Sequence, residues 1–373
     1  MNILIAADSF KDALDSFSVC SAIERGLDMA SPDFHISSFP LADGGEGTTD
    51  VLFYHLGGRK QTLIVNDSLF RPVKVDYLVT EDGKTAFIEM AKSAGLQLLT
   101  PAERNPMQTS SFGLGEMIRH AIDQGVKNII LAIGGSATND GGMGMAAALG
   151  FQFIDIHGRL LKGSGSDLNK IETITVSDEL ISTLEKINFS VICDVKNPLL
   201  GPEGASFTYG KQKGADEDML KILDDGLKHL AIKSNKLNLA SIEGSGAAGG
   251  LGFGAMAFLN ARLHRGIDLI IQLTDFETKV KNCDLIITGE GKIDNQTNQG
   301  KLILGITDIA SKYKIPVIAL CGTLEATPAN IKDLGLNAAF SITPKPCELS
   351  LALSETAINL ETTAYNIGSL LKG

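Results

Sequence analysis

Short apolar runs alternate with amphipathic segments at both ends of the chain. The apolar runs have the length of strands, and the segments between them repeat apolar residues every three or four positions, as helices do. In the predicted helix 18–30, one face carries Val19, Ala22, Ile23 and Leu27. A second helix is predicted at 301–312, and strands are predicted at 2–6, 36–41, 285–288, 317–320 and 339–342. This alternation predicts a parallel sheet covered by helices on both faces.

Five such strands complete a flavodoxin-like (Rossmann-like) sheet, so the two ends are expected to form one discontinuous α/β domain. We predict that this domain comprises residues 1–61 and 284–373, interrupted by a second α/β domain at 62–283. Polar and apolar residues alternate at 61–65, 71–80 and 84–90, which predicts antiparallel strands. Further on, strands are predicted at 128–133 and 189–193 and helices at 111–124, 143–149 and 216–234. The inserted domain therefore has a mixed sheet, and we expect the active site in the cleft between the domains.

Composition supports a folded, two-domain chain and narrows its partners. The 373 residues exceed one ordinary core, and 44% hydrophobic with 21% charged residues is typical of globular proteins. The net charge of −11 comes without a concentrated basic patch, which argues against nucleic acid or an anionic membrane as a partner. The expected partners are therefore small molecules.

The chain carries no pattern typical of export. Its first residues form a core strand rather than a signal peptide, and the longest uncharged stretch, 244–261, is too rich in glycine to span a membrane. The five cysteines are scattered and show no C-x-x-C spacing, which favours buried, reduced thiols over metal ligands or disulfides. A cytoplasmic location is expected.

Two glycine-rich stretches carry the strongest chemical signal. They are DGGEGT at residues 43–48 and GGSATNDGG at residues 134–142, and each lies between a predicted strand and the expected start of a helix. Glycine lets main-chain N–H groups approach an anion closely, and neighbouring carboxylates suit a hard cation bound to that anion. The combination indicates phosphate and magnesium chemistry.

Charged and glycine-rich segments recur at the predicted carboxyl ends of strands. These segments are residues 8–11, 43–46, 134–140, 194 and 289–294. Ligands of parallel α/β sheets bind at that edge, where loops and helix N-termini converge. The segments contribute lysines for phosphate charge and several carboxylates, which are the groups that phosphoryl transfer requires.

Other nucleotide-binding patterns are weak or missing. Residues 244–249 match G-x-G-x-x-G, but the stretch before them makes a poor strand, so close backbone packing at a helix start is favoured over dinucleotide binding. The Walker A sequence and the protein-kinase motif set do not occur. The loop at 134–142 is therefore interpreted as a phosphate loop of another type.

The chain resembles the bacterial type I glycerate kinases over essentially its full length. The matching stretches are DSFK at 8–11, LADGGEGT at 41–48, GGSATNDGG at 134–142, CDV at 193–195, NPLLGP at 197–202, QKGA at 212–215 and TGEG at 288–291 with Asp294. This resemblance implies a two-domain α/β enzyme that uses ATP and Mg²⁺ to phosphorylate (R)-glycerate at the 2-hydroxyl, giving 2-phosphoglycerate. The chain departs from the family pattern at Ala7, Asp12, residues 209–211 and Asn295.

With this resemblance, roles can be predicted for individual residues. Lys11, Asp194 and Asp43 are the candidate catalytic residues: Lys11 would neutralise the substrate carboxylate or the transferring phosphoryl group, and Asp194 would orient or deprotonate the hydroxyl. The predicted substrate-binding residues are Asp8, Ser9, Lys11, Gly44, Gly45 and Glu46. The predicted nucleotide-binding residues are Gly134, Gly135, Ser136, Ala137, Thr138, Asn139, Gly289, Glu290 and Gly291.

The Mg²⁺ ligands are left open among several carboxylates. The candidates are Asp43, Glu46, Asp140, Asp194 and Asp294, with Glu46, Asp140 and Asp294 preferred. Two alternatives to glycerate phosphorylation also stay open: a kinase for another small hydroxy acid or polyol, and a nucleotide-binding relative without catalytic activity.

Overall fold

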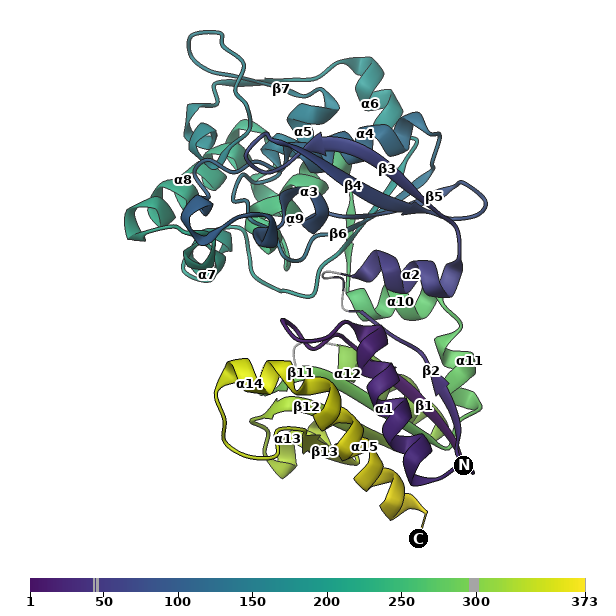
Figure 1. Ribbon diagram of the computed structural model, residues 1–373. Coiled ribbons are helices and arrows are strands. Elements are labelled where there is room, and N and C mark those ends of the chain that lie inside the picture. The colour runs from purple at the N-terminus through teal and green to yellow at the C-terminus, as the bar shows by residue number, and fades with distance from the viewer. Residues whose placement is uncertain (43, 45–46, 295–301, 373) are drawn as a thin grey trace. The chain divides into compact units, whose positions relative to one another are not determined.

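The computed structural model describes residues 1–42, 44, 47–294 and 302–372 (Figure 1). The chain forms two compact units: a terminal unit, Met1–Asp43 with Arg265–Gly373, and an inserted unit, Gly44–His264. The boundaries predicted from the sequence lie later in the chain at both crossings. One reason is that β3 (Arg59–Asn66) pairs with β4 (Pro72–Val79) along its whole length, so the inserted sheet begins before residue 62.

In the terminal unit, the described strands form a parallel sheet in the order β13-β12-β11-β1-β2. Its strands are β1 Asn2–Ala7, β2 His35–Ser38, β11 Leu285–Ile293, β12 Val317–Leu324 and β13 Ala338–Ser341. Counted within the unit, the order is 2-1-3-4-5, that of a flavodoxin-like sheet. The fold class predicted from the alternating strands and helices is confirmed.

Helices accompany this sheet in the terminal unit, and some of them flank it in Figure 1. They are α1 Ser16–Ala30, α10 Gly266–Leu273, α11 Phe276–Lys281, α12 Leu302–Tyr313, α13 Pro328–Asp333, α14 Leu349–Ser354 and α15 Thr356–Leu371. The predicted apolar face of α1 is fully buried, and it packs on α15 and the sheet. Gly26 permits this contact, since a Cβ there would lie 2.2 Å from the carbonyl oxygen of Glu361.

In the inserted unit, the described strands form a mixed sheet in the order β10-β9-β6-β5-β4-β3. The additional strands are β5 Thr85–Glu89, β6 Asn128–Ala132, β9 Asn188–Ile192 and β10 Arg262–His264. β3, β4 and β5 are antiparallel, as predicted, and β5, β6, β9 and β10 are parallel. A separate two-stranded antiparallel sheet, β7 Gln152–Ile154 and β8 Thr173–Thr175, was not predicted.

The helices of the inserted unit pack around this sheet. They are α2 Thr48–Leu56, α3 Ala91–Ala94, α4 Phe112–Asp123, α5 Met143–Leu149, α6 Asp178–Leu184, α7 Ala205–Tyr209, α8 Glu217–Lys233 and α9 Ala247–Leu259. The stripe predicted along α8 is buried, since Leu220, Leu223, Leu227 and Leu230 are each at most 1% exposed. Leu227 and Leu230 belong to one hydrophobic cluster beneath α8, Leu220 and Leu223 belong to a smaller one with Ala215, and a third cluster lies around the sheet.

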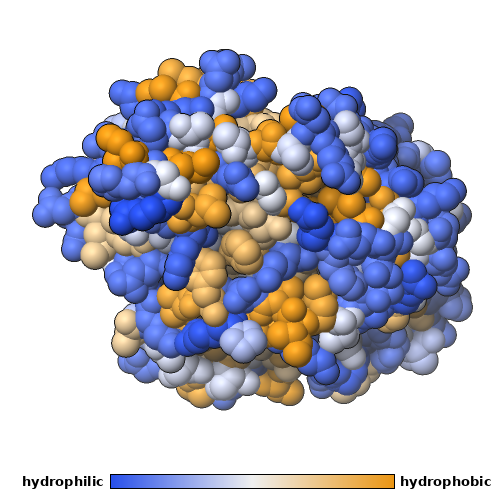
Figure 2. All heavy atoms as spheres, turned by 90° about the horizontal axis from the view of Figure 1, so that it is seen from above, coloured by the Kyte–Doolittle hydropathy of each residue, from blue (hydrophilic) through white to orange (hydrophobic). Residues whose placement is uncertain are grey.

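The cysteines qualify one expectation from the sequence. Cys20, Cys283 and Cys321 are buried and Cys193 is partly buried, but Cys347 is exposed in the segment before α14, so the prediction of buried thiols is wrong for Cys347. Within the described part of the chain, no helix has both the length and the apolar character needed to cross a membrane. Figure 2 shows apolar residues in separate groups among hydrophilic ones on the face in view.

Candidate functional site

Predicted site residues gather at the carboxyl edge of the terminal sheet. β1 runs parallel to β11, and the Asp8 N–H, just beyond β1, donates to the Gly289 carbonyl at 3.0 Å. The Asp8 carboxylate accepts from the Ser9 N–H at 2.6 Å. Gly291 lies against the next residues, because a Cβ there would be 3.6 Å from the Lys11 nitrogen. The sheet topology therefore brings these five residues together.

The turn that carries Lys11 explains one departure from the family pattern. Phe10 and Leu14 exchange backbone hydrogen bonds at 2.8 and 2.9 Å, which closes a tight turn. Asp12, where the family usually has glycine, has φ of 62°. Short polar residues tolerate this left-handed conformation better than most side chains do, so aspartate can replace glycine there. Lys11 beside it is exposed to solvent.

Asp294, one of the preferred magnesium ligands, lies beside a lysine. Lys292 Nζ is 3.3 Å from Asp294 Oδ2 and 2.8 Å from Glu325 Oε2. The hydrogen bonds to Glu325 and Asp294 raise the pKa of Lys292, so this lysine keeps its charge. An ammonium group at this distance opposes a second cation at the same carboxylate.

A second set of predicted residues lies at the carboxyl edge of the inserted sheet. β6 and β9 are parallel neighbours with Ala132 opposite Ile192, so Gly134 and Asp194 follow adjacent strand ends. The segment after β9 is also tied to the start of α9, where Gly246 N–H donates to the Asn197 carbonyl at 3.0 Å. Asp194 and the glycine-rich loop therefore share one edge of the sheet.

Most side chains of the glycine-rich loop point into the protein. Gly134 and Gly135 reach the surface, with Gly135 at φ of 71°, whereas residues 136–140 are buried. Asn139 Nδ2 donates to Ser206 Oγ at 3.0 Å, and the Ala137 carbonyl accepts from Thr109 Oγ1 at 2.9 Å. Ser136 Oγ and Asn139 Nδ2 thus tie the loop to its surroundings, whereas Thr138 Oγ1 and Asn139 Oδ1 are buried without a hydrogen-bond partner among the described residues. The glycine tip is the exposed part of the loop.

Asp140, the other described residue preferred as a magnesium ligand, is also engaged internally. It is fully buried, and its carboxylate accepts from Ser111 N–H and Ser111 Oγ, both at 2.7 Å, and from the N–H groups of Gly142 and Gly144, both at 3.2 Å. Burial raises the pKa of this carboxyl, and the donated hydrogen bonds oppose the rise. The arrangement joins the start of α5 to the residue preceding α4.

Lys213 completes this buried polar cluster, although no role was predicted for it from the sequence. It ends the short 3₁₀ helix Lys211–Lys213 and is 2% exposed. Its Nζ donates to Ser136 Oγ at 2.9 Å and to the Thr138 carbonyl at 2.7 Å. Burial lowers the pKa of Lys213 to about 7, although Asp140 opposes the fall. No periodicity marks this lysine as buried; the matched QKGA stretch was its sole signal.

The pKa of Lys213 predicts a pH-dependent stability. Between about pH 7 and its ordinary value near 10.5, the unfolded chain binds this proton and the folded chain does not, so the free energy of unfolding rises with pH. The slope is at most about 1.4 kcal/mol per pH unit for one proton. Urea titrations of the wild type and Lys213→Met between pH 7 and 8.5 test this. The window stops at pH 8.5 because burial raises the pKa of several thiols, and their titration lowers the free energy of unfolding at higher pH. Equal slopes would show that Lys213 does not titrate there.

The DGGEGT motif is described in part. Asp43, Gly45 and Glu46 lie outside the described residues, and Gly44 is buried with φ of 94°. The motif leads into α2, whose Thr49 donates from N–H and Oγ1 to Glu89 Oε1 at 2.6 and 2.7 Å. Glu89 is a buried carboxylate that is not among the residues predicted from the sequence. The sign of it in the sequence is an acidic residue at the end of a strand, directly after the apolar residues 86–88.

The described carboxylates do not form a ready-made metal centre. Across residues 1–42, 44, 47–294 and 302–372, no group of three His, Cys, Asp or Glu residues could hold an ion. Asp140 belongs to the inserted unit and Asp294 to the terminal unit. Mg²⁺ commonly binds through one or two carboxylates, several waters and the substrate phosphates, so a preformed cluster is not required.

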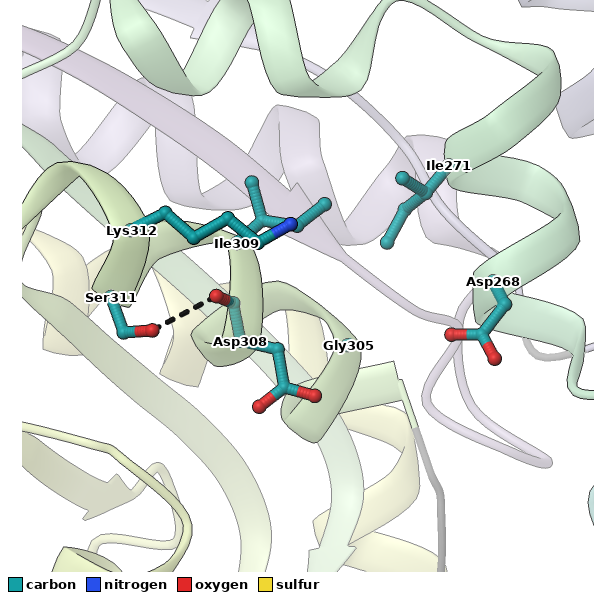
Figure 3. A pocket seen from close by; sticks show the side chains of 7 residues that line it. All are labelled: Asp268, Ile271, Gly305, Asp308, Ile309, Ser311 and Lys312. Atoms are coloured by element: carbon teal, nitrogen blue, oxygen red, sulfur yellow. Dashed lines mark hydrogen bonds between the residues drawn. The ribbon is translucent and has the colours of Figure 1, made fainter.

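Two hollows in the described structure lie away from the predicted residues. One, of about 520 Å³, lies between α10 and α12; Figure 3 shows Asp268 and Ile271 from the first helix and Asp308, Ile309 and Lys312 from the second. The other, of about 530 Å³, lies in the inserted unit. Its lining includes Phe70, Gln108, Arg159 and Lys170. The lining of both hollows contains none of the predicted catalytic, substrate or nucleotide residues.

The G-x-G-x-x-G match is confirmed as close backbone packing. Gly249 has φ of 68°, and a Cβ there would lie 2.0 Å from the Thr138 carbonyl oxygen in the glycine-rich loop. Gly83, with φ of 69°, has no atom within 4 Å of its Cβ position. We expect Gly83→Ala to cost about 1–2 kcal/mol through conformation alone and Gly249→Ala at least about 3 kcal/mol. Equal losses in urea titration would contradict the packing role.

Known proteins match this chain from end to end. The model of the glycerate kinase family matches residues 3–372. A glycerate kinase of Bacillus cereus is 44% identical, covering 100% of this chain and 98% of its own, and a glycerate 2-kinase of Escherichia coli is 40% identical with the same coverage. A crystal structure from Salmonella typhimurium LT2, provisionally assigned as glycerate kinase 2, has a TM-score of 0.84 and 42% identity over 100% of this chain and 98% of its own. This chain therefore belongs to the glycerate kinase family and is a kinase.

Proposed function

We propose that this protein transfers the γ-phosphoryl group of ATP to the 2-hydroxyl of (R)-glycerate, with Mg²⁺, to give 2-phosphoglycerate. The observation that carries the proposal is the end-to-end match to glycerate kinases, including one named a glycerate 2-kinase. The placement of the glycine-rich tip and Asp194 at adjacent strand ends supports it, because that edge is where parallel sheets bind ligands.

In this proposal the chain's residues position charge around the transferring group. Gly134 and Gly135 are the exposed part of the loop, and in this proposal their N–H groups bind nucleotide phosphate. Asp194 orients or deprotonates the glycerate hydroxyl, and Lys11 neutralises the glycerate carboxylate or the transferring phosphoryl group. When bound with the nucleotide, Mg²⁺ would neutralise phosphate charge.

The proposal also assigns residues of both units to one reaction. Asp8, Ser9 and Lys11 belong to the terminal unit, and Asp194 and the glycine-rich loop belong to the inserted unit. Because phosphoryl transfer needs acid, cation and phosphate-binding groups together, we propose that both sets act on the same reactants.

An acceptor panel tests this function. ADP formation is measured with ATP and Mg²⁺ against D-glycerate, L-glycerate, glycolate, lactate and glycerol, each with and without EDTA. We expect EDTA-sensitive turnover that is fastest with D-glycerate. Faster turnover with another acceptor would identify a kinase for a different hydroxy compound, and nucleotide binding without turnover would identify a non-catalytic relative.

A further inference from the structure

Arg104 differs from the other arginines of this acidic chain. Its side chain is half-buried and its Nε is fully buried, yet no described residue accepts a hydrogen bond from it or forms an ion pair with it. Burying part of a guanidinium without a partner is unfavourable, because its charge and its donors lose water.

The remaining arginines are either paired or exposed. Arg25, Arg71, Arg159 and Arg265 pair with carboxylates, Arg119 binds the Leu149 carbonyl, and Arg59 and Arg262 lie on the surface. Glu103, the acid next to Arg104 in sequence, does not supply the missing partner. It accepts hydrogen bonds from Arg71 at 2.6 Å and from Thr100 at 2.9 and 3.0 Å.

Arg104 lies beside the residues that hold the glycine-rich loop. A Cβ at Gly214 would be 2.0 Å from the Arg104 carbonyl oxygen and 3.1 Å from Arg104 Cβ, so the two backbones are in contact. The residue before Gly214 is Lys213, whose Nζ donates to Ser136 in the loop. A few residues after Arg104, Thr109 and Ser111 donate to the same loop.

Three segments, around residues 104–111, 134–142 and 211–214, therefore pack against one another in the inserted unit. They contribute three cations, of which Lys211 is exposed and pairs with Glu217 at 2.7 Å. The cations that are at least partly buried are Arg104 and Lys213, and the buried carboxylate is Asp140. Lys213 already has two acceptors within the protein, and its charge faces that of Asp140. The guanidinium is the cation left without an acceptor.

We propose that Arg104 binds an oxyanion of a reactant at the glycine-rich loop. This inference rests on the proposed function, which supplies two such groups: the nucleotide phosphates and the glycerate carboxylate. A guanidinium presents paired donors that match phosphate and carboxylate equally well, so the shared chemistry is recognition of a two-oxygen anion.

The test compares Arg104→Gln and Arg104→Lys with the wild type, and with Arg59→Gln as the matched loss of an exposed, unpaired arginine. Initial rates are measured against ATP at saturating D-glycerate and against D-glycerate at saturating ATP. We expect Arg104→Gln to raise one of the two KM values roughly tenfold to a hundredfold, the loss typical of a charged hydrogen bond. Arg104→Lys should recover part of that loss, and Arg59→Gln should change neither value. The affected reactant identifies the oxyanion.

Calorimetry separates this inference from the proposed function. Inorganic tripolyphosphate and D-glycerate are titrated into the wild type, Arg104→Gln and Arg104→Lys, which needs no turnover. If the wild type fails to phosphorylate glycerate but Arg104→Gln still binds tripolyphosphate at least tenfold more weakly, the anion site stands and the proposed function falls. KM values and binding within threefold of wild type in both variants would overturn the role of Arg104. A rise of both KM values to the same extent, together with a lower melting temperature, would also overturn it, because that result would mark a structural arginine.

Discussion

Replacing Asp140 with alanine is expected to cost about 3–5 kcal/mol of stability, because it removes one partner of a buried charged cluster. The carboxylate accepts four hydrogen bonds where solvent does not reach, so its loss leaves the donors at Ser111, Gly142 and Gly144 without an acceptor. Urea titration of the variant against the wild type measures this loss.

Two further variants show whether the effect comes from these bonds. Three of the four donors converge on Oδ2, so Asp140→Asn, with its amide oxygen at that position, keeps most of them and should lose about 1–2 kcal/mol. Asp218→Ala removes an exposed carboxylate of the same unit and should cost at most about 1 kcal/mol. If Asp140→Ala unfolds like the wild type but loses Mg²⁺-dependent activity, Asp140 is a metal ligand and the structural role is wrong.

Removing either candidate catalytic group is expected to reduce turnover at least a hundredfold. Lys11→Ala deletes an exposed lysine beside Asp8 and Gly291, and Asp194→Asn removes the charge at the end of β9. Loss of one electrostatic stabiliser typically raises the barrier by about 3 kcal/mol. Steady-state kcat measurements and melting curves of both variants check the expectation. A variant with near wild-type kcat does not have the role proposed for it.

The double variant tests whether the two units act on one reaction. Residues that act as a unit in one step are strongly non-additive, so if Lys11 and Asp194 act together, Lys11→Ala with Asp194→Asn should lose much less than the product of the single losses. Fully multiplicative losses would indicate groups that act independently.

The elements with clear periodicity were predictable from the sequence. The strands of the terminal sheet and the apolar faces of α1 and α8 appear where the pattern of apolar residues places them, because burial of one face sets that pattern. The crossings between units were displaced, since an edge strand such as β3 is amphipathic and carries no sign of which sheet it joins. Short strands such as β7 are too brief for a periodic pattern.

The candidate site, like the fold, could be predicted only in part. Strand ends could be predicted, and so could the glycine-rich segments that follow them. The direction in which each polar side chain points could not be predicted. An asparagine or aspartate that is buried, as Asn139 and Asp140 are, cannot be told from one that binds a ligand by the sequence alone. The roles inferred for Lys213 and Arg104 could not be predicted from the sequence either. Their importance comes from burial and from the presence or absence of partners, which depend on residues distant in sequence.

The most direct test of the proposed reaction is phosphorus-31 NMR of the products formed from ATP, Mg²⁺ and D-glycerate. We expect ADP and one new phosphomonoester resonance that coincides with added authentic 2-phosphoglycerate. A resonance that coincides with 3-phosphoglycerate, or ADP with inorganic phosphate alone, would contradict phosphorylation of glycerate at the 2-hydroxyl.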